Sequence, residues 1–221
     1  MSGTHSDEPP VLQHHFDNLG QQFEASSLGM WLFLVTEILF FGGLFTAYMV
    51  YRMAYPEAFA EASHHLNIVL GGTNTAVLIG SSLTMAMAVY AAQQGDRNRQ
   101  VLFLVLTMVL GLVFLGVKSV EYSHKFAEGL VPGPNFRFEG DAIHAQLFFS
   151  LYFVMTGLHA LHMIIGIGIM AVLTAFAWRG RYTRRYHTPV EVSGLYWHFV
   201  DIVWIFLFPL LYLIDRHGAV R

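Results

Sequence analysis

Five long apolar runs alternate with short polar stretches along this chain of 221 residues. The runs cover residues 28–51, 66–92, 101–120, 142–178 and 194–214. A helix of roughly 20 apolar residues crosses the ~30 Å hydrocarbon layer of a bilayer. The pattern therefore predicts an all-α fold, a polytopic membrane helix bundle with five transmembrane helices.

The fourth run is longer than an upright span requires. Residues 142–178 would extend ~55 Å as one helix, which is too long for one upright crossing and too short for two crossings with a turn. We predict a single tilted helix that begins near Asp141. Gly157, Gly166 and Gly168 would permit close packing or a bend in it.

The remaining segments complete the domain organisation. Residues 1–27 form a polar N-terminal tail without Lys or Arg, residues 28–214 a single transmembrane domain, and residues 215–221 a C-terminal tail. The joints contain the turn-forming sequences GDRNR, EGLVPGPNFRFEGD and RGRYTRRYHTPVE. No soluble domain is inserted between the spans.

The distribution of basic residues predicts an orientation. Short cytoplasmic loops carry an excess of Lys and Arg. Two short loops hold six arginines, which are Arg97, Arg99, Arg179, Arg181, Arg184 and Arg185. With five spans, a cytoplasmic position for these loops leaves the N-terminus in the cytoplasm and the C-terminus on the outer side.

Composition agrees with a membrane protein and excludes several functions. Hydrophobic residues make up 55% of the chain and charged residues 12%, against about 25% charged residues in soluble domains. The chain has no cysteine, which excludes disulfides, thiolate metal sites and iron–sulfur clusters. A net charge of −3 gives no strong attraction to nucleic acid.

Ionisable residues inside the spans are the candidate functional residues. Glu37 lies in the run LGMWLFLVTEILFFGG, where a carboxylate costs at least ~2.5 kcal/mol on insertion scales. His159 and His162 lie three residues apart in another span, as do His198 and Asp201 in the last. We predict that His198 and Asp201 satisfy each other, and that Glu37 is either protonated or paired with His162 or His159.

Other chemistry fits these residues less well. Two histidines three residues apart on one helix cannot ligate one haem iron from opposite sides, so hydrogen bonds between helices are the preferred interpretation and haem ligation stays an alternative. We predict no catalytic residue, no metal ligand and no cofactor-binding residue. Lys118 and Glu121 flank the outer end of the third run, where long side chains snorkel to the interface.

Four motifs resemble subunit III of the haem–copper oxidases, in family order from about residue 28 to 214. LGMWLFLVTEILFFGGLF is similar to that family's GM-x-LF-x-x-SE-x-LFF, and VKSVEYSHKF to its EY segment. TGLHALHMIIG resembles its TGFHGLHV-x-IG, and LYWHFVDIVWIFLF its WYWHFVDVVW-x-FL. The chain departs from the family by having Thr36 where the motif has Ser, and by lacking the first two of seven helices, as do many bacterial members.

The resemblance implies a supporting role in a respiratory terminal oxidase, most simply cytochrome c oxidase, in a bacterial inner membrane. That complex reduces oxygen to water and pumps protons. The family's subunit III is not itself catalytic and binds no haem or copper, which lie in the partner subunits. It packs against the catalytic subunit I, beside subunit II and further respiratory subunits, supports proton uptake and carries phospholipids. The family's buried polar residues fall on Glu37, His159, His162, His198 and Asp201.

Alternatives stay open on the sequence. Within the family, they are subunit III of a quinol oxidase of the bo type and a shorter relative associated with nitric oxide reductase. From other classes, they are a haem-bearing membrane anchor and a proton-coupled transporter that uses Glu37. The absence of an internal repeat argues against the transporter.

Overall fold

The computed structural model describes residue 13 and residues 15–214, and these residues form six α-helices. They are α1 (Leu19–Ala54), α2 (Pro56–His64), α3 (Ile68–Gln94), α4 (Arg97–Ala127), α5 (Ala142–Trp178) and α6 (Thr188–Tyr212). Every helix except α2 is long and apolar enough to cross a membrane. The predicted all-α bundle of five spanning helices is confirmed.

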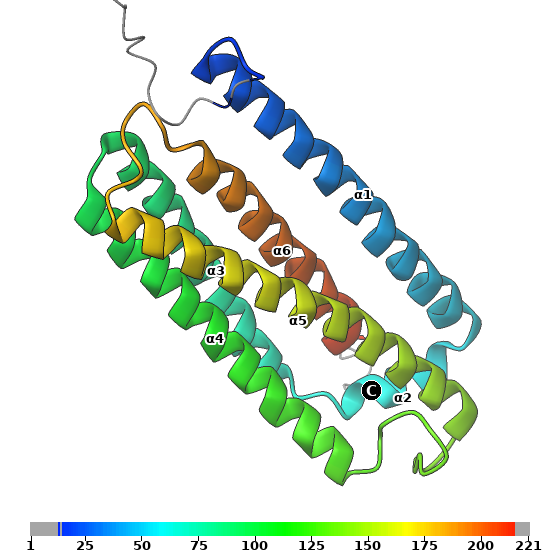
Figure 1. Cartoon of the computed structure of the whole chain (residues 1–221). Helices are drawn as coiled ribbons and strands as arrows, with labels where there is room; N and C mark the ends of the chain where they lie inside the picture. The colour runs from blue at the N-terminus through cyan, green and yellow to red at the C-terminus, as the bar shows by residue number, and fades with distance from the viewer. Residues whose placement is uncertain (1–12, 14, 215–221) are drawn as a thin grey trace, which may run out of the picture.

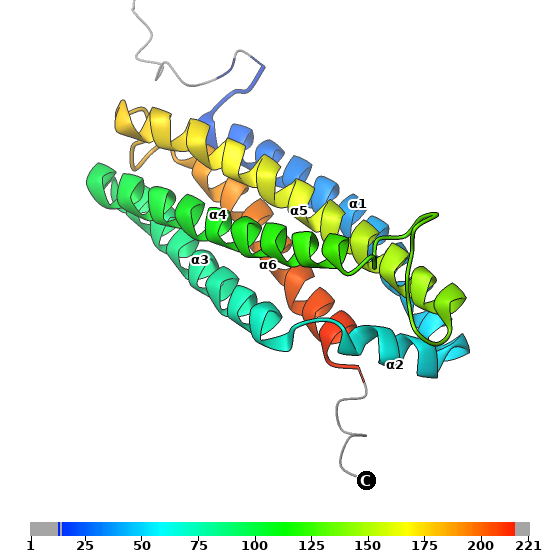
Figure 2. The same cartoon turned by 90° about the horizontal axis from the view of Figure 1, so that it is seen from below.

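The long helices run side by side, with α1 along one edge of the bundle (Figures 1 and 2). Within the described residues, α1 contacts α2, α5 and α6 but neither α3 nor α4. Helix α6 packs closely along α1, α2, α3 and α5, and its side chains also reach α4, where Tyr212 bonds Lys118 and Glu121. One face of α6 therefore lies between α1 and α3 with no other helix of the described residues over it.

Several helix ends, those of α1 and α4 above all, extend beyond the predicted spans because capping residues, and not hydropathy, decide where a helix stops. Helix α1 begins at Leu19, since the side chain of Asn18 accepts a hydrogen bond from the Gln21 amide. Residues 19–27, predicted as tail, are thus helical. Helix α4 begins after the cap Asp96 and continues to Ala127, well past residue 120. Predictions for residues 1–12, 14 and 215–221 lie outside the described part of the chain.

The short helix α2 was not predicted from the hydrophobic pattern. Pro56 stands at its first position, where a fixed φ and a missing N–H favour helix initiation. Its buried side chains include Ala58, Phe59 and Ala62, and the Phe59 ring packs edge-on against Phe148 of α5 at 5.4 Å between centroids. Helix α2 thereby closes one end of the bundle beside α5 and α6 (Figure 2).

Helix α5 is the predicted single long helix. Asp141 caps it by accepting from the His144 amide at 3.3 Å, and its carboxylate also bonds the His144 imidazole. The side-chain hydrogen bond from His144 lowers the pKa of Asp141 below its ordinary range. The helix therefore begins directly after Asp141, where the sequence predicted its start.

Trp197 of α6 lies at the centre of the bundle, where two glycines make room for it. A Cβ on Gly111 of α4 would lie 2.9 Å from the indole, and one on Gly166 of α5 would lie 3.0 Å from it. The indole N–H donates to Ser81 Oγ of α3 at 3.2 Å. Close packing at Gly166 is confirmed, whereas nothing lies within 4 Å of a Cβ at Gly168.

Candidate functional site

Glu37 of α1 meets His162 of α5 inside the bundle. Their Oε2 and Nε2 atoms lie 3.1 Å apart, and the two side chains are 19% and 13% exposed. The edge of the Phe41 ring, one turn further along α1, packs against the imidazole at 5.3 Å between centroids. Of the two partners proposed for Glu37, the structure selects His162.

The hydrogen bond made by the other ring nitrogen of His162 fixes the position of one proton. His162 Nδ1 lies 2.8 Å from the Leu158 carbonyl oxygen, and a carbonyl can only accept, so Nδ1 carries a hydrogen. The second proton then lies between Nε2 and the Glu37 carboxylate. The pair is either a neutral acid with a neutral imidazole or a carboxylate with an imidazolium. Both forms have zero net charge, which suits a site of low polarity.

His159 lies one turn from His162 but takes no part in this pair. It is 1% exposed and packs between the rings of Phe114 and Trp204, at 5.3 and 5.2 Å between centroids. Neither of its ring nitrogens has a hydrogen-bond partner among the residues that the structure describes. His159 therefore contributes packing between α4, α5 and α6.

The predicted pairing of His198 with Asp201 is wrong. His198 Nδ1 instead shares a hydrogen bond of 2.7 Å with the Ser82 hydroxyl of α3. The carboxyl of Asp201, which is 3% exposed, lies beside the same Ser82 hydroxyl and not beside the imidazole. Spacing placed the two residues on one side of the helix, but the imidazole reaches the neighbouring helix.

Lys118 and Glu121 of α4 form a buried polar cluster with Tyr152 of α5 and Tyr212 of α6. Lys118 Nζ donates to Glu121 Oε2 at 2.9 Å and to both tyrosine hydroxyls at 3.0 Å. Each hydroxyl in turn donates to Glu121 Oε1, at 3.0 Å from Tyr152 and 2.6 Å from Tyr212. The cluster binds three helices together.

This cluster overturns the prediction that Lys118 and Glu121 snorkel to the interface. Lys118 is 3% exposed and Glu121 2%, because α4 continues for two turns beyond the predicted end of its span. The ammonium also lies 5.0 Å from the Tyr152 ring centroid and 5.3 Å from that of Trp204. A signal was present in the sequence, since both residues continue the three- and four-residue spacing of the buried positions Gln100, Leu104, Thr107, Gly111 and Phe114.

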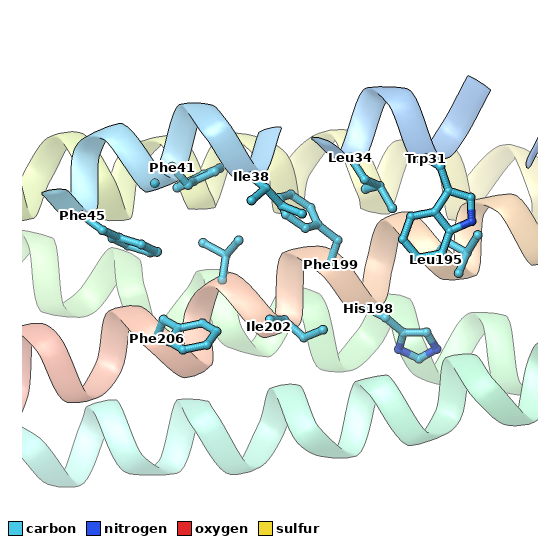
Figure 3. Close-up of a pocket in the computed structure, with 12 residues that line it drawn as sticks. Trp31, Leu34, Ile38, Phe41, Phe45, Leu195, His198, Phe199, Ile202 and Phe206 are labelled. Atoms are coloured by element: carbon cyan, nitrogen blue, oxygen red, sulfur yellow. The ribbon is translucent and has the colours of Figure 1, made fainter. Parts of the chain in front are cut away.

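An apolar groove runs between α1 and α6 on the outside of the bundle. Figure 3 shows Trp31, Ile38 and Phe45 of α1 opposite Phe199 of α6. The cavity between them has a volume of about 500 Å³, within the range of small-molecule sites. His198 contributes the imidazole at its edge and points away from α1 (Figure 3).

The described residues contain no group of three or more His, Asp or Glu side chains placed to hold a metal ion. His159 and His162 do not face a third ligand there.

Comparison with known proteins agrees with the motifs. The family model described as cytochrome c oxidase subunit III matches residues 13–215. Cytochrome c oxidase subunit 3 of Synechocystis is 38% identical over 187 residues, 84% of this chain and 74% of the relative. The Thermostichus vulcanus protein of the same name is 33% identical, covering 86% and 87% of the two chains. A probable quinol oxidase subunit 3 of Staphylococcus haemolyticus is 30% identical, covering 90% and 93%.

The chain belongs to the cytochrome c oxidase subunit III family. It is a multi-pass membrane protein, and it is subunit III of a haem–copper terminal oxidase. Members of this family carry no metal centres of their own. The buried polar residues described above therefore lie in a chain whose family leaves redox chemistry to its partners.

The Glu37–His162 contact predicts an infrared signature. His162→Ala removes the partner of the Glu37 carboxyl, so the carboxyl vibration of Glu37 should shift in the variant relative to the wild type. The assignment comes from the band that disappears in Glu37→Gln. His159→Ala is the matched control and should leave that band in place. A carboxyl band that is identical in the wild type and in His162→Ala would contradict the pairing.

The Lys118 cluster predicts a large loss of stability. Lys118→Met leaves Glu121 as a buried charge without its counter-ion, which costs about 3–5 kcal/mol in buried pairs. The double variant Lys118→Met/Glu121→Gln should recover much of the loss, because no charge then remains buried. Unfolding in mild detergent measures the effect, with Ser119→Met at an exposed position of the same turn as control. A Lys118→Met chain as stable as the wild type would refute a structural role for the cluster.

Proposed function

We propose that this chain is the non-catalytic supporting subunit III of a bacterial cytochrome c oxidase, a complex that reduces oxygen to water and pumps protons. The observation that supports the proposal is that the buried polar groups of this chain bond one another between helices. Glu37, His162, Lys118 and Glu121 are engaged with side chains of other helices in the same bundle. Groups held in this way stabilise a scaffold and offer no reacting centre.

Cytochrome c is the proposed electron donor of the complex. The Synechocystis relative named cytochrome c oxidase subunit 3 is 38% identical to this chain, whereas the Staphylococcus haemolyticus relative named probable quinol oxidase subunit 3 is 30% identical. The second candidate is a quinol oxidase of the bo type, which the ubiquinol oxidase subunit 3 of Pseudomonas aeruginosa supports at 31% identity over 90% of each chain. Electrons enter through partner subunits, so this chain carries no donor site of its own.

We further propose that the chain supports proton uptake by subunit I and protects that subunit during turnover. In this proposal the Glu37–His162 pair holds α1 in place and does not itself relay protons, since both ring nitrogens of His162 have hydrogen-bond partners within the bundle. The chain sits with its N-terminus in the cytoplasm and its C-terminus outside. The six loop arginines support this orientation: Arg184 Nε donates to the Gln94 carbonyl at 2.6 Å, so the two basic loops meet at one end of the bundle.

A phospholipid acyl chain is the proposed occupant of the groove between α1 and α6. Its lining is almost wholly apolar and its walls include the aromatic rings of Phe41, Phe45 and Phe199. The groove faces outward from α6, where α1 alone shields it. An acyl chain matches the apolar chemistry of this surface.

Purification of the oxidase with and without this chain tests the supporting role. The complex without the chain should begin oxygen reduction with reduced cytochrome c at a comparable rate, then lose activity faster during turnover. Added chain should restore the lifetime. The same preparation assayed with a quinol decides the electron donor. An unchanged lifetime in the absence of the chain would refute the supporting role.

Filling the groove tests the bound lipid. Gly42 lines the cavity and a Cβ there meets nothing within 4 Å, so Gly42→Leu should occupy acyl-chain space without distorting α1. Phosphorus analysis of the purified complex should then find fewer tightly bound phospholipids than in the wild type. Gly43→Leu is the matched control, because Gly43 is exposed and does not line the cavity. Equal lipid content in both variants would contradict the proposal that a phospholipid binds in this groove.

A further inference from the structure

A second cavity continues the groove between α1 and α6 toward the end of the bundle where the two basic loops meet. Its volume is about 360 Å³, and its walls come from α1, α3 and α6. Leu195 and His198 of α6 line both the groove and this cavity. Figure 3 shows these two side chains at the Trp31 end of the groove, away from Phe45 and Phe206. The groove and the cavity therefore form one continuous cleft along α6.

The second cavity differs from the groove in its polar side chains. Ser27 of α1, Gln93 of α3 and Glu191 of α6 line it, whereas no Asp, Glu, Lys or Arg lines the groove. Ser27 directly precedes the predicted first span, Gln93 is the second-last residue of α3, and Glu191 stands in the first turn of α6. Because spanning helices end among the phospholipid head groups, the polar part of the cleft lies at head-group depth.

Glu191 gives this polar part a carboxylate that a ligand can reach. Its Oε1 atom accepts a hydrogen bond from Gln93 Nε2 at 2.5 Å and lies 3.2 Å from His187 Nε2. Its Oε2 atom makes no hydrogen bond with the residues that the structure describes, and the side chain is 19% exposed. The lining of this cavity contains neither Lys nor Arg. The carboxylate is thus held in place through one oxygen and open to the cavity through the other.

The charge of Glu191 separates the classes of phospholipid head group. An anionic head group would bring like charges together, which is unfavourable. A primary ammonium can pair with the carboxylate and also donate a charge-assisted hydrogen bond to Oε2. A quaternary ammonium has the same charge but no N–H to donate. The best match to the whole cleft is therefore an amphiphile with an apolar chain and a primary ammonium at its polar end.

We propose that the cleft along α6 holds a phospholipid whose head group carries a primary ammonium, and that Glu191 recognises this ammonium. The acyl chain lies in the groove between α1 and α6. The phosphate lies toward Arg184, whose Nε donates to the Gln94 carbonyl at the same end of α3. Gln93 and His187 orient the carboxylate by holding its other oxygen. The inference rests on the acyl chain proposed above and adds the class and the position of the head group.

Lipid competition in the intact oxidase tests the class of head group. The complex is equilibrated in vesicles with equal amounts of phosphatidylethanolamine, phosphatidylcholine and phosphatidylglycerol, and its bound lipids are identified by mass spectrometry after mild extraction. The lipid lost in Gly42→Leu, which fills the groove, is the lipid of this site. We expect phosphatidylethanolamine, enriched about two- to fivefold over its share of the vesicle, the range for a partly exposed ion pair. Loss of the three lipids in equal amounts, or of phosphatidylglycerol alone, would overturn the proposal.

Substitution of Glu191 tests the contact. Glu191→Gln removes the charge but keeps an acceptor for Gln93, so the site should keep a phospholipid and lose its preference for phosphatidylethanolamine. Ser27→Lys places a tethered ammonium in the cavity and should abolish the preference without altering Glu191. The matched control is Glu24→Gln, an exposed carboxylate one turn from Ser27 that does not line the cavity, and it should leave the preference unchanged. A preference that survives Glu191→Gln, or that Glu24→Gln abolishes equally, would refute recognition by Glu191.

These outcomes separate the head group from the acyl chain. Bound lipid that is lost in Gly42→Leu but shows no preference refutes the proposed head-group class and leaves the acyl chain in the groove. Equal lipid content in Gly42→Leu and Gly43→Leu refutes the acyl chain, and the inference about the head group with it.

Discussion

Polar side chains inside this bundle must find their partners on neighbouring helices, because hydrocarbon offers them neither water nor counter-ions. The arrangement of the helices follows from that constraint. Lys118 and Glu121 draw α5 and α6 to α4 through Tyr152 and Tyr212. Smaller bonds do the same elsewhere, since Trp204 of α6 donates to Thr75 of α3 at 3.0 Å. Apolar packing alone distinguishes poorly between helix and lipid, so these bonds supply much of the specificity.

The two sides of the molecule differ in how closely neighbouring helices surround their polar side chains. Between α3, α4, α5 and α6, Trp197 fits against two glycines and its indole N–H reaches Ser81. On the outward face of α6, apolar cavities border Asp201 and His198, and α1 shields only one edge. An uncovered face of this kind is consistent with a chain that is one subunit among several.

How much of the fold and of its polar contacts could be predicted depends on whether each is set by residues close together in the chain or by contacts between helices. A helix must be long and apolar enough to cross the bilayer, so hydropathy alone located all five spans. The sequence left Glu37 with two candidate histidines, His159 and His162. The choice of His162 depends on how α5 is rotated, which sequence spacing does not reveal. Lys118 and Glu121 were misplaced because hydropathy falls at charged residues even when the helix and its buried face continue. Likewise, Asp201 seemed paired with His198 until α3 offered Ser82.

Helix α1 is made before the helices that supply its polar partners. Its contacts within the described residues are with α2, α5 and α6. Glu37 finds its imidazole 125 residues later in the chain, and the Tyr48 hydroxyl donates to the carbonyl of Leu210, 162 residues later. During synthesis α1 must therefore stay in the bilayer with its carboxyl unmatched until the final spans arrive. The edge position of α1 leaves the remaining helices room to pack beside it.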